Sequence, residues 1–358
     1  MAIKPKDIYR GKRRYRTLIT VLVSVFLALL IGAVVMFYSL QKYLTYSQDG
    51  VSLELPMFST GVETEAEKPI GTELVEPVEI VVTTPNFDDI PANSGEGLAE
   101  LKAIYIPFDK VSEEGISDAV VRAEENGANA LVFQMKPSSG YLAYRSTVEI
   151  ADSYGVNGTL NMHETLPVLK EESSLWMAAE ISVCIDDAMS TRNIPIALKN
   201  YEGSVYSDSE GSWLDPYNRA MREYITGLMA ELSEIGFDEI ILTNVAHPAD
   251  ADAVVYSQTM TTALDVNSCI YSLSMWIKES MDGYDARISA MYKEQNGQDM
   301  NFFMKVFDRL CRETPEESMG DYKSQVGSTI QGGDVNFRFV PIVQYATENP
   351  SWIRKIAD

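Results

Sequence analysis

Apolar residues recur in this chain with two periods, one typical of buried strands and one typical of amphipathic helices. The pattern is clearest between residues 213 and 248. Asp215 and Pro216 suit the first turn of a helix, and Gly236 permits the left-handed conformation that ends one. Between them, apolar side chains recur at helical spacing: Tyr217, Met221, Tyr224, Ile225, Leu228, Leu232 and Ile235. The nearly continuous apolar run 239–245 follows and predicts a strand that is covered on both faces.

Similar units recur in the C-terminal part of the chain, so strands and helices are expected to alternate. Besides the unit above, the expected strands are 103–107, 130–136, 180–185, 268–273, 286–292 and 337–344. The expected helices are 113–126 and 164–177, and two more near 271–281 and 300–311 compete for some of the same residues. This alternation predicts one α/β domain at 101–358, a TIM-like (β/α)8 barrel. Because only seven strands are recognised, an incomplete barrel remains an alternative to a closed one.

The N-terminal region predicts a membrane anchor. Residues 18–38 form an uncharged apolar run, which as a helix spans a hydrocarbon core of about 30 Å. The basic residues of the preceding tail, 1–17, place that tail in the cytoplasm and the remainder of the chain outside the membrane. A cleaved signal peptide is the alternative, which the length of the run and the lack of an A-x-A site disfavour.

Residues 39–100 are rich in Glu, Thr, Pro and Ser and contain few apolar side chains that folding could bury. Burial there does not offset an ordering cost of about 1–2 kcal/mol per residue, so a flexible acidic stalk is expected. It serves either as a spacer through a cell wall or as a plain tether, and the sequence favours neither.

Charge and composition narrow the classes of function. With 52 acidic and 29 basic residues the net charge is −23, which disfavours nucleic acid and anionic lipid as partners of the outer domain. Cys184, Cys269 and Cys311 have no spacing typical of a disulfide framework or a zinc site. His163 and His247 are the only histidines, so no metal site is predicted. The chain has no phosphate-binding or dinucleotide motif, and no cofactor is expected.

Two stretches of sequence resemble the putative glycoside-hydrolase family, β/α-barrel proteins that form a domain family of unknown function. The matching motifs are W-L-D-P-Y at 213–217, G-F-D-E-I at 236–240, K-A-I-Y-I-P at 102–107 and the stretch 127–144. In the last stretch Lys136, Gly140 and Tyr144 match the family. Gln134 and Thr243 stand where the family has Asp. The resemblance implies a TIM-type barrel for glycan chemistry, with family acids missing from this chain.

Hydrolysis of a glycosidic bond usually requires two carboxyl groups, one of which stays protonated. Gln134 and Thr243 cannot provide them, because amide and hydroxyl groups do not titrate near neutral pH. The remaining catalytic candidates are Asp186 and Asp187, which follow the third expected strand, and Asp215. An Asp at such a position more often caps a loop or a helix.

Sugar binding depends on aromatic faces and hydrogen-bonding groups, and it survives the loss of acids more easily than catalysis does. The side chains expected to bind a polysaccharide at one rim of the barrel are Tyr105, Gln134, Lys136, Trp213, Asn244, His247, Tyr292 and Gln344. Each can instead serve packing or backbone hydrogen bonding. Lys136, at the end of a buried strand, requires either a functional role or an ionic partner.

The sequence therefore predicts a membrane-anchored, outward-facing barrel that binds a cell-envelope or extracellular polysaccharide through a degenerate catalytic site. Two alternatives remain open. The first is an active glycosidase that uses displaced carboxylates such as Asp186 or Asp215. The second is a scaffold that recruits envelope proteins.

Overall fold

The computed structural model describes residues 90–356 except 92, 258–266, 294–295, 331 and 346. It also describes Ile19, Val23 and two short strands near the N-terminus. The chain divides into two compact units, Met1–Glu79 and Ile80–Asp358, and each is described by itself.

In the first unit, β1 (Leu44–Ser47) and β2 (Gly50–Leu53) form an antiparallel pair inside the segment expected to be a stalk. The predicted membrane helix at 18–38 lies outside the described residues, apart from Ile19 and Val23. Within the described part of the chain, no helix combines the length and the apolar composition needed to cross a membrane.

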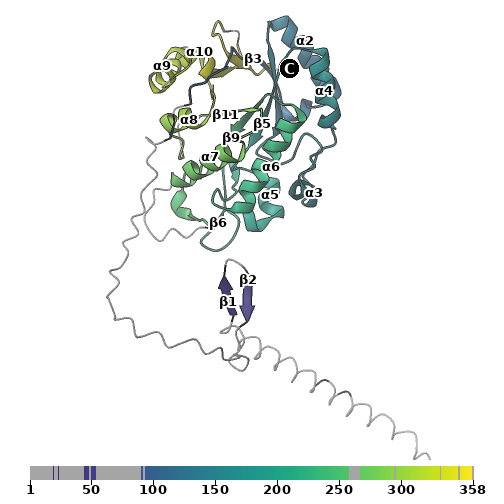
Figure 1. Ribbon diagram of the computed structural model, residues 1–358, viewed down its shortest axis with the longest axis vertical. Helices are drawn as coiled ribbons and strands as arrows, with labels where there is room; N and C mark the ends of the chain where they lie inside the picture. The colour runs from purple at the N-terminus through teal and green to yellow at the C-terminus, as the bar shows by residue number, and fades with distance from the viewer. Residues whose placement is uncertain are drawn as a thin grey trace, which may run out of the picture. The chain divides into compact units, whose positions relative to one another are not determined.

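The second unit is built on a closed barrel of eight parallel strands (Figure 1). In chain order the strands are β3 (Lys102–Ile106), β4 (Ala130–Lys136), β5 (Trp176–Ser182), β9 (Glu239–Thr243), β11 (Arg287–Met291), β12 (Leu310–Glu313), β13 (Phe339–Val343) and β14 (Trp352–Arg354). The last strand pairs with the first, which closes the barrel. The predicted TIM-like fold is confirmed, and the alternative of an incomplete barrel is wrong.

Helices lie around the outside of the strands (Figure 1). They are α2 (Glu113–Asn126), α3 (Glu149–Ser153), α4 (Met162–Glu172), α5 (Asp187–Arg192), α6 (Arg219–Ile235), α7 (Ser268–Ser280), α8 (Met300–Val306), α9 (Met319–Thr329) and α10 (Val335–Arg338). Short 3-10 turns occur at Phe108–Lys110, Ile194–Ile196, Ala251–Ala253 and Glu316–Ser318. Two small antiparallel pairs lie outside the barrel, β6 (Lys199–Asn200) with β10 (Val254–Val255) and β7 (Ser207–Asp208) with β8 (Gly211–Ser212).

Several elements differ from the sequence prediction. The expected helix 164–177 ends at Glu172, and β5 starts at Trp176 where the strand was expected from residue 180. The expected strand 268–273 is the start of helix α7, as the competing helix prediction had it, and its buried side chains Cys269, Leu273 and Ile277 follow helical spacing. The expected helix 300–311 ends at Val306, and β12 takes its last residues. Strand β14 was not recognised. Both missed strands are too short, at four and three residues, to show a periodicity.

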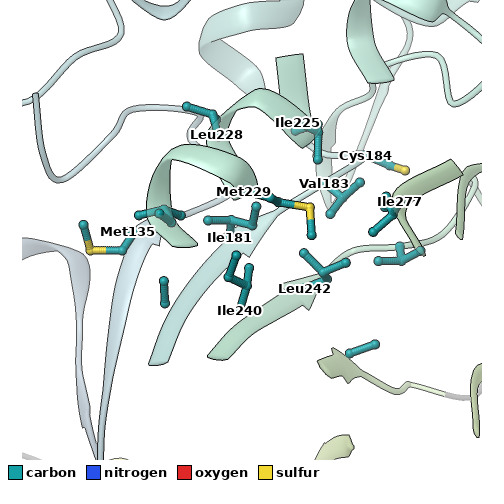
Figure 2. Packing of buried hydrophobic residues seen from close by; sticks show 14 of the residues in the cluster. Met135, Ile181, Val183, Cys184, Ile225, Leu228, Met229, Ile240, Leu242 and Ile277 are labelled. Carbon is teal, nitrogen blue, oxygen red and sulfur yellow. The ribbon is translucent and has the colours of Figure 1, made fainter. Parts of the chain in front are cut away.

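Helix α6 begins one turn later than predicted. The side chain of Asn218 accepts the Ala220 and Met221 backbone N–H groups and therefore caps the helix, a role expected for Asp215. Gly236 ends the helix with a φ of 112°, as predicted. The apolar stripe is confirmed, and Figure 2 shows Ile225 and Met229 on the α6 side of the packing, facing the strands below.

A second apolar cluster fills the inside of the barrel. It consists of Leu101, Ala103, Ala130, Val132, Ala178, Ile241, Met291, Cys311, Val340, Ile342 and Ile353. Because these side chains occupy the middle of the barrel, polar inward-facing residues are confined to its two ends. The C-terminal end is where β/α barrels carry their active sites.

Candidate functional site

Side chains from three adjacent strands meet at one buried carboxyl group near the C-terminal end of the barrel. The Tyr105 hydroxyl on β3 donates to Oε1 of Glu180 on β5 at 2.9 Å. The Gln134 amide on β4 donates to the same oxygen at 3.2 Å. The Gln134 carbonyl oxygen accepts the Phe108 backbone N–H at 3.1 Å, which fixes the orientation of the amide. Glu180 itself is 6% exposed.

A second carboxyl group, that of Glu313, ends strand β12 at the same end of the barrel. Lys355, which follows β14, lies with its Nζ 2.8 Å from the Glu313 Oε1. The same ammonium group lies 5.2 Å from the centre of the Tyr105 ring. Because the Tyr105 hydroxyl binds Glu180, Lys355 connects the surroundings of the two carboxyl groups. An open cavity of about 490 Å³ begins here, lined by Glu313, Thr314, Pro315, Tyr322, Ile342, Val343, Gln344, Tyr345 and Lys355.

The pKa values of the two carboxyl groups shift in opposite directions. Burial raises the pKa of Glu180, although the bonds from Tyr105 and Gln134 and the charge of Lys355 oppose this. The hydrogen bond and charge of Lys355 hold the pKa of Glu313 below its usual value. Burial and the charges of both carboxylates raise the pKa of the Tyr105 hydroxyl, which therefore remains a donor. Opposite pKa shifts of two carboxyl groups are a feature that acid–base pairs in enzymes share.

Lys136 forms a buried ion pair, which is one of the two outcomes expected for it. Its Nζ lies 2.8 Å from Oδ2 of Asp186 and donates to the Ser182 carbonyl oxygen at 2.7 Å. Neither charged side chain is exposed to solvent. The other oxygen of Asp186 accepts the Met189 backbone N–H at the start of α5. The structure therefore does not bring Lys136 to a surface where a sugar could contact it.

Gly140 and Tyr144, which share the sequence resemblance with Lys136, support the same packing. Gly140 has a φ of 82°, and a Cβ atom there would lie 1.8 Å from Oδ1 of Asp186. The Tyr144 hydroxyl donates to Oε2 of Glu231 on α6 at 2.7 Å. Lys136, Gly140 and Tyr144 thus fix the loop after β4 against α5 and α6.

Three of the aromatic residues expected to bind sugar lie in the core. Trp213 is 1% exposed, and Tyr292, 6% exposed, packs edge-on against Phe303. The His247 ring is buried, with its nitrogens 2.7 Å from the Pro248 carbonyl oxygen and 3.1 Å from Oδ1 of Asn267. Their faces are covered by protein, so the expected stacking on a sugar is corrected here to packing.

Asn244 joins the ends of three strands. Its amide donates to the Ser138 hydroxyl at 3.0 Å and to the Ser182 hydroxyl at 2.9 Å. The backbone φ of Asn244 is 53°, a left-handed conformation that Asn tolerates better than most residues. The neighbouring Thr243 hydroxyl contacts the Ile181 carbonyl oxygen at 3.4 Å. Asn244 is half-buried and organises the loop after β4.

The aspartates proposed as displaced catalytic groups all bind backbone N–H groups. Asp215 accepts Tyr217 N–H at 2.9 Å and Ser257 N–H at 2.6 Å and is 3% exposed. Asp187 is exposed and accepts the Ser212 N–H at 2.8 Å. Together with the ion-paired Asp186, they have the capping role that was the alternative for them.

Of the residues predicted to bind sugar, Tyr105, Gln134 and Gln344 lie around the Glu180 and Glu313 groups. Sequence reasoning missed both of these glutamates and Lys355. The strand carrying Glu180 was expected at 180–185, which places Glu180 at its start, whereas β5 runs from Trp176 to Ser182. A correct strand register would have revealed Glu180 as a residue near the C-terminal end.

The described residues hold no group of three or more His, Cys, Asp or Glu side chains arranged for a metal ion. Cys184, Cys269 and Cys311 are buried free thiols. Burial raises the pKa of the Cys184 thiol to about 12, so it is not an activated nucleophile.

A closed β/α barrel with two carboxyl groups at its C-terminal end belongs to the class of barrels that can carry hydrolytic sites. The family model described as "Putative glycosyl hydrolase domain" matches residues 103–311, more than half of the chain, and the protein belongs to that family. No curated protein matches this sequence.

The solved structures to which this chain is similar include two in complex with a sugar and one described as a hypothetical protein. A hypothetical protein from Ruminiclostridium thermocellum is 23% identical over 52% of this chain and 96% of its own, with a TM-score of 0.46. An exo-β-N-acetylglucosaminidase from Vibrio harveyi, in complex with N-acetylglucosamine, is 9% identical over 68% of this chain, with a TM-score of 0.47. This chain covers 41% of the length of the Vibrio enzyme. Ega3 from Aspergillus fumigatus, in complex with galactosamine, is 10% identical over 74% of this chain and 92% of its own, with a TM-score of 0.41.

Proposed function

We propose that this protein is a glycoside hydrolase in which Glu180 is the general acid and Glu313 is the second carboxyl group. The observation that carries the proposal is the arrangement of two carboxyl groups at the C-terminal end of the barrel, Glu180 buried beneath hydrogen bonds from Tyr105 and Gln134 and Glu313 ion-paired with Lys355. Their opposite pKa shifts agree with this arrangement. In this assignment Glu180 protonates the glycosidic oxygen, and the ionised Glu313 activates water or attacks the sugar directly. Membership of the family supports the reaction class.

The contacts of Glu180 suit a carboxyl group that holds a proton. The hydrogen bonds from Tyr105 and Gln134 both end on Oε1, so a proton on Oε2 leaves both of them intact. Gln134 stands where the family has Asp and cannot titrate, but it orients the neighbouring acid. The proposal thus assigns positioning roles to Tyr105 and Gln134.

The substrate class follows from the cavity beside Glu313. Tyr322 and Tyr345 supply aromatic surface, and the Gln344 amide supplies a donor and an acceptor. Such a mixture suits the C–H faces and hydroxyls of a sugar unit. The proposed substrate is a cell-envelope or extracellular polysaccharide, reached by a barrel that the apolar run 18–38 anchors outside the membrane. The proposed location of the barrel outside the membrane is inferred from the sequence of the N-terminal region alone.

A second candidate is a glycan-binding protein without hydrolytic activity, as the sequence first suggested. What favours it is that Gln134 and Thr243 stand at positions where the sequence resemblance implies Asp. Binding without cleavage then uses the same cavity, with Glu180 kept as a buried hydrogen-bonding group.

One experiment separates the two candidates. The full-length protein in mild detergent is incubated with insoluble cell-wall glycan, chitin and β-glucan, and bound protein and released reducing ends are both measured. The hydrolase proposal predicts release by the wild type and a loss of about 100-fold or more in Glu180→Gln and Glu313→Gln. Glu149→Gln, at an exposed position on α3, is the control. Binding without release supports the second candidate, and unaffected release in both variants excludes the assignment of the acids.

A further inference from the structure

The end of the barrel opposite Glu180 carries a second cavity, of about 420 Å³. It is bordered by residues that precede or begin the barrel strands, among them Glu100, Asn129, Trp176, Asp238, Arg287 and Arg309. The N-terminal ends of barrel strands usually contribute to stability and not to catalysis. A cavity of this size at that end therefore requires its own explanation.

Trp176 provides an aromatic surface in this cavity. It is the first residue of β5 and is 36% exposed, whereas Trp213 and Trp352 are 1% and 8% exposed. Its indole Nε1 donates to Oε2 of Glu239 at 3.1 Å. Glu239 is fully buried and also accepts the Ser289 hydroxyl at 2.5 Å. The ring is therefore held in one orientation while part of it remains open to solvent.

The charged groups that line the cavity are all paired. The pairs are Glu100 with Lys102 at 3.0 Å, Lys170 with Asp238 at 2.6 Å, Arg287 with Asp308 at 3.8 Å and Arg309 with Glu239 at 3.2 Å. Among the described residues that line the cavity, each charged side chain therefore has an opposite charge within 4 Å. The lining is polar but locally neutral, which suits a neutral ligand with many hydroxyl groups.

Short polar side chains at the border complete the lining. The Asn129 amide is fixed by the Lys102 backbone N–H at 2.8 Å and the Glu100 carbonyl oxygen at 2.9 Å. Ser174 is exposed beside Trp176. A rigid aromatic face next to an oriented amide and hydroxyl groups is the combination that sugar rings bind.

We propose that this cavity is a second carbohydrate-binding site, which takes a neutral sugar unit stacked on Trp176. The argument depends on Trp176 and on the paired charges around it. It does not depend on hydrolysis at Glu180, and a protein without catalytic activity would bind sugar here equally well. A polymer held at this end adds to the affinity of the whole protein for insoluble glycan.

The site is tested on the full-length protein by the oxidation of Trp176 with N-bromosuccinimide, followed by peptide mass mapping. Chitohexaose and cellohexaose are the neutral probes and trigalacturonate is the anionic one. At least one neutral probe is expected to slow the oxidation of Trp176 in a saturable way, and trigalacturonate is not. Calorimetric titration of the same probe then gives its affinity for each variant.

Two variants keep the test decisive. Trp176→Ala removes the ring, and Ser174→Arg fills the cavity without removing any hydrogen bond of the described structure. Each is expected to weaken binding about tenfold or more. Tyr284→Ala is the matched control, because Tyr284 is 38% exposed just before β11 and does not line the cavity.

The proposal is overturned if no neutral probe protects Trp176, if trigalacturonate protects it equally, or if Ser174→Arg binds as the wild type does. Glu180→Gln should retain this binding, which separates a failure here from a failure of the hydrolase assignment.

Discussion

The Nζ atom of Lys136 lies 2.8 Å from Oδ2 of Asp186, and both side chains are fully buried. The pair connects the end of β4 to the first turn of α5, because Asp186 also caps that helix. The stretch of sequence that matches the family around Lys136 therefore maintains the C-terminal end of the barrel, while the candidate acids lie elsewhere.

Lys136→Met should lower the free energy of unfolding by about 3–5 kcal/mol, because Asp186 is left as an unpaired buried charge. Urea unfolding followed by circular dichroism measures the change. The double variant Lys136→Met/Asp186→Asn should recover part of the loss, since its buried groups are neutral. A loss below about 1 kcal/mol in the single variant would show that water compensates Asp186.

Gly140→Ala should be far more destabilising than Gly203→Ala. Both glycines have a φ of 82°, so the cost of the left-handed backbone is common to the two variants. A Cβ atom at Gly140 would lie 1.8 Å from the Asp186 carboxylate, whereas one at Gly203 has no atom within 4 Å. The difference between the two unfolding free energies isolates the clash. Equal losses would mean that Asp186 moves aside freely.

Glu231 should make the fold sensitive to acid. Burial alone would raise its pKa, but hydrogen bonds from Ser146, Thr147 and Tyr144 outweigh this and lower it. A lowered folded pKa means that the ionised group stabilises the fold above the unfolded pKa of about 4.3 and that this stabilisation is lost as the pH falls through the folded value. Unfolding free energies at pH 7 and pH 3 should differ less in Glu231→Gln than in the wild type. An unchanged difference would assign the acid sensitivity to other groups.

Hydrolysis should show a bell-shaped pH dependence. Activity is lost as the pH rises through the raised pKa of Glu180, which must be protonated, and as the pH falls through the lowered pKa of Glu313, which must be ionised. Lys355 lowers both pKa values, so Lys355→Met should move both limbs of the profile to higher pH. Lys199→Met, at a half-buried position on β6, should leave the profile in place. A profile that is identical in the two variants would contradict the role of Lys355.

Whether an element was predicted from the sequence depended on its length. Strand β4 was predicted with its observed bounds because it opens with four apolar residues in a row, 130–133, and is long enough for the pattern to be recognised. Strand β14 was not predicted because three residues are too few to show the alternation of apolar and polar positions that marks a strand. Pairing across the barrel, which closes β14 onto β3, is a long-range property that local patterns do not contain.

The candidate site was predicted only in part, because the prediction of its residues depended on where each strand was expected to begin and end. Tyr105 and Gln134 were placed at strand ends, and both contact Glu180. Glu180 itself was missed because the start of β5 was misplaced by four residues, which hid its position along the barrel. Lys136 was correctly expected to need either a function or an ionic partner. That this partner is the buried Asp186, and that Trp213 is covered by other residues, depends on the tertiary fold and could not be predicted from local sequence.

The two carboxyl roles are tested most directly with substrates whose leaving groups differ in basicity. The measurement compares hydrolysis of the polysaccharide with hydrolysis of a 2,4-dinitrophenyl glycoside of the same sugar. Glu180→Gln should lower polysaccharide hydrolysis about 10²–10⁴-fold and leave the dinitrophenyl glycoside within about tenfold of the wild type, because that leaving group needs no proton. Glu313→Gln should abolish both activities. Equal losses on the two substrates in Glu180→Gln, or full activity in either variant, would contradict the account.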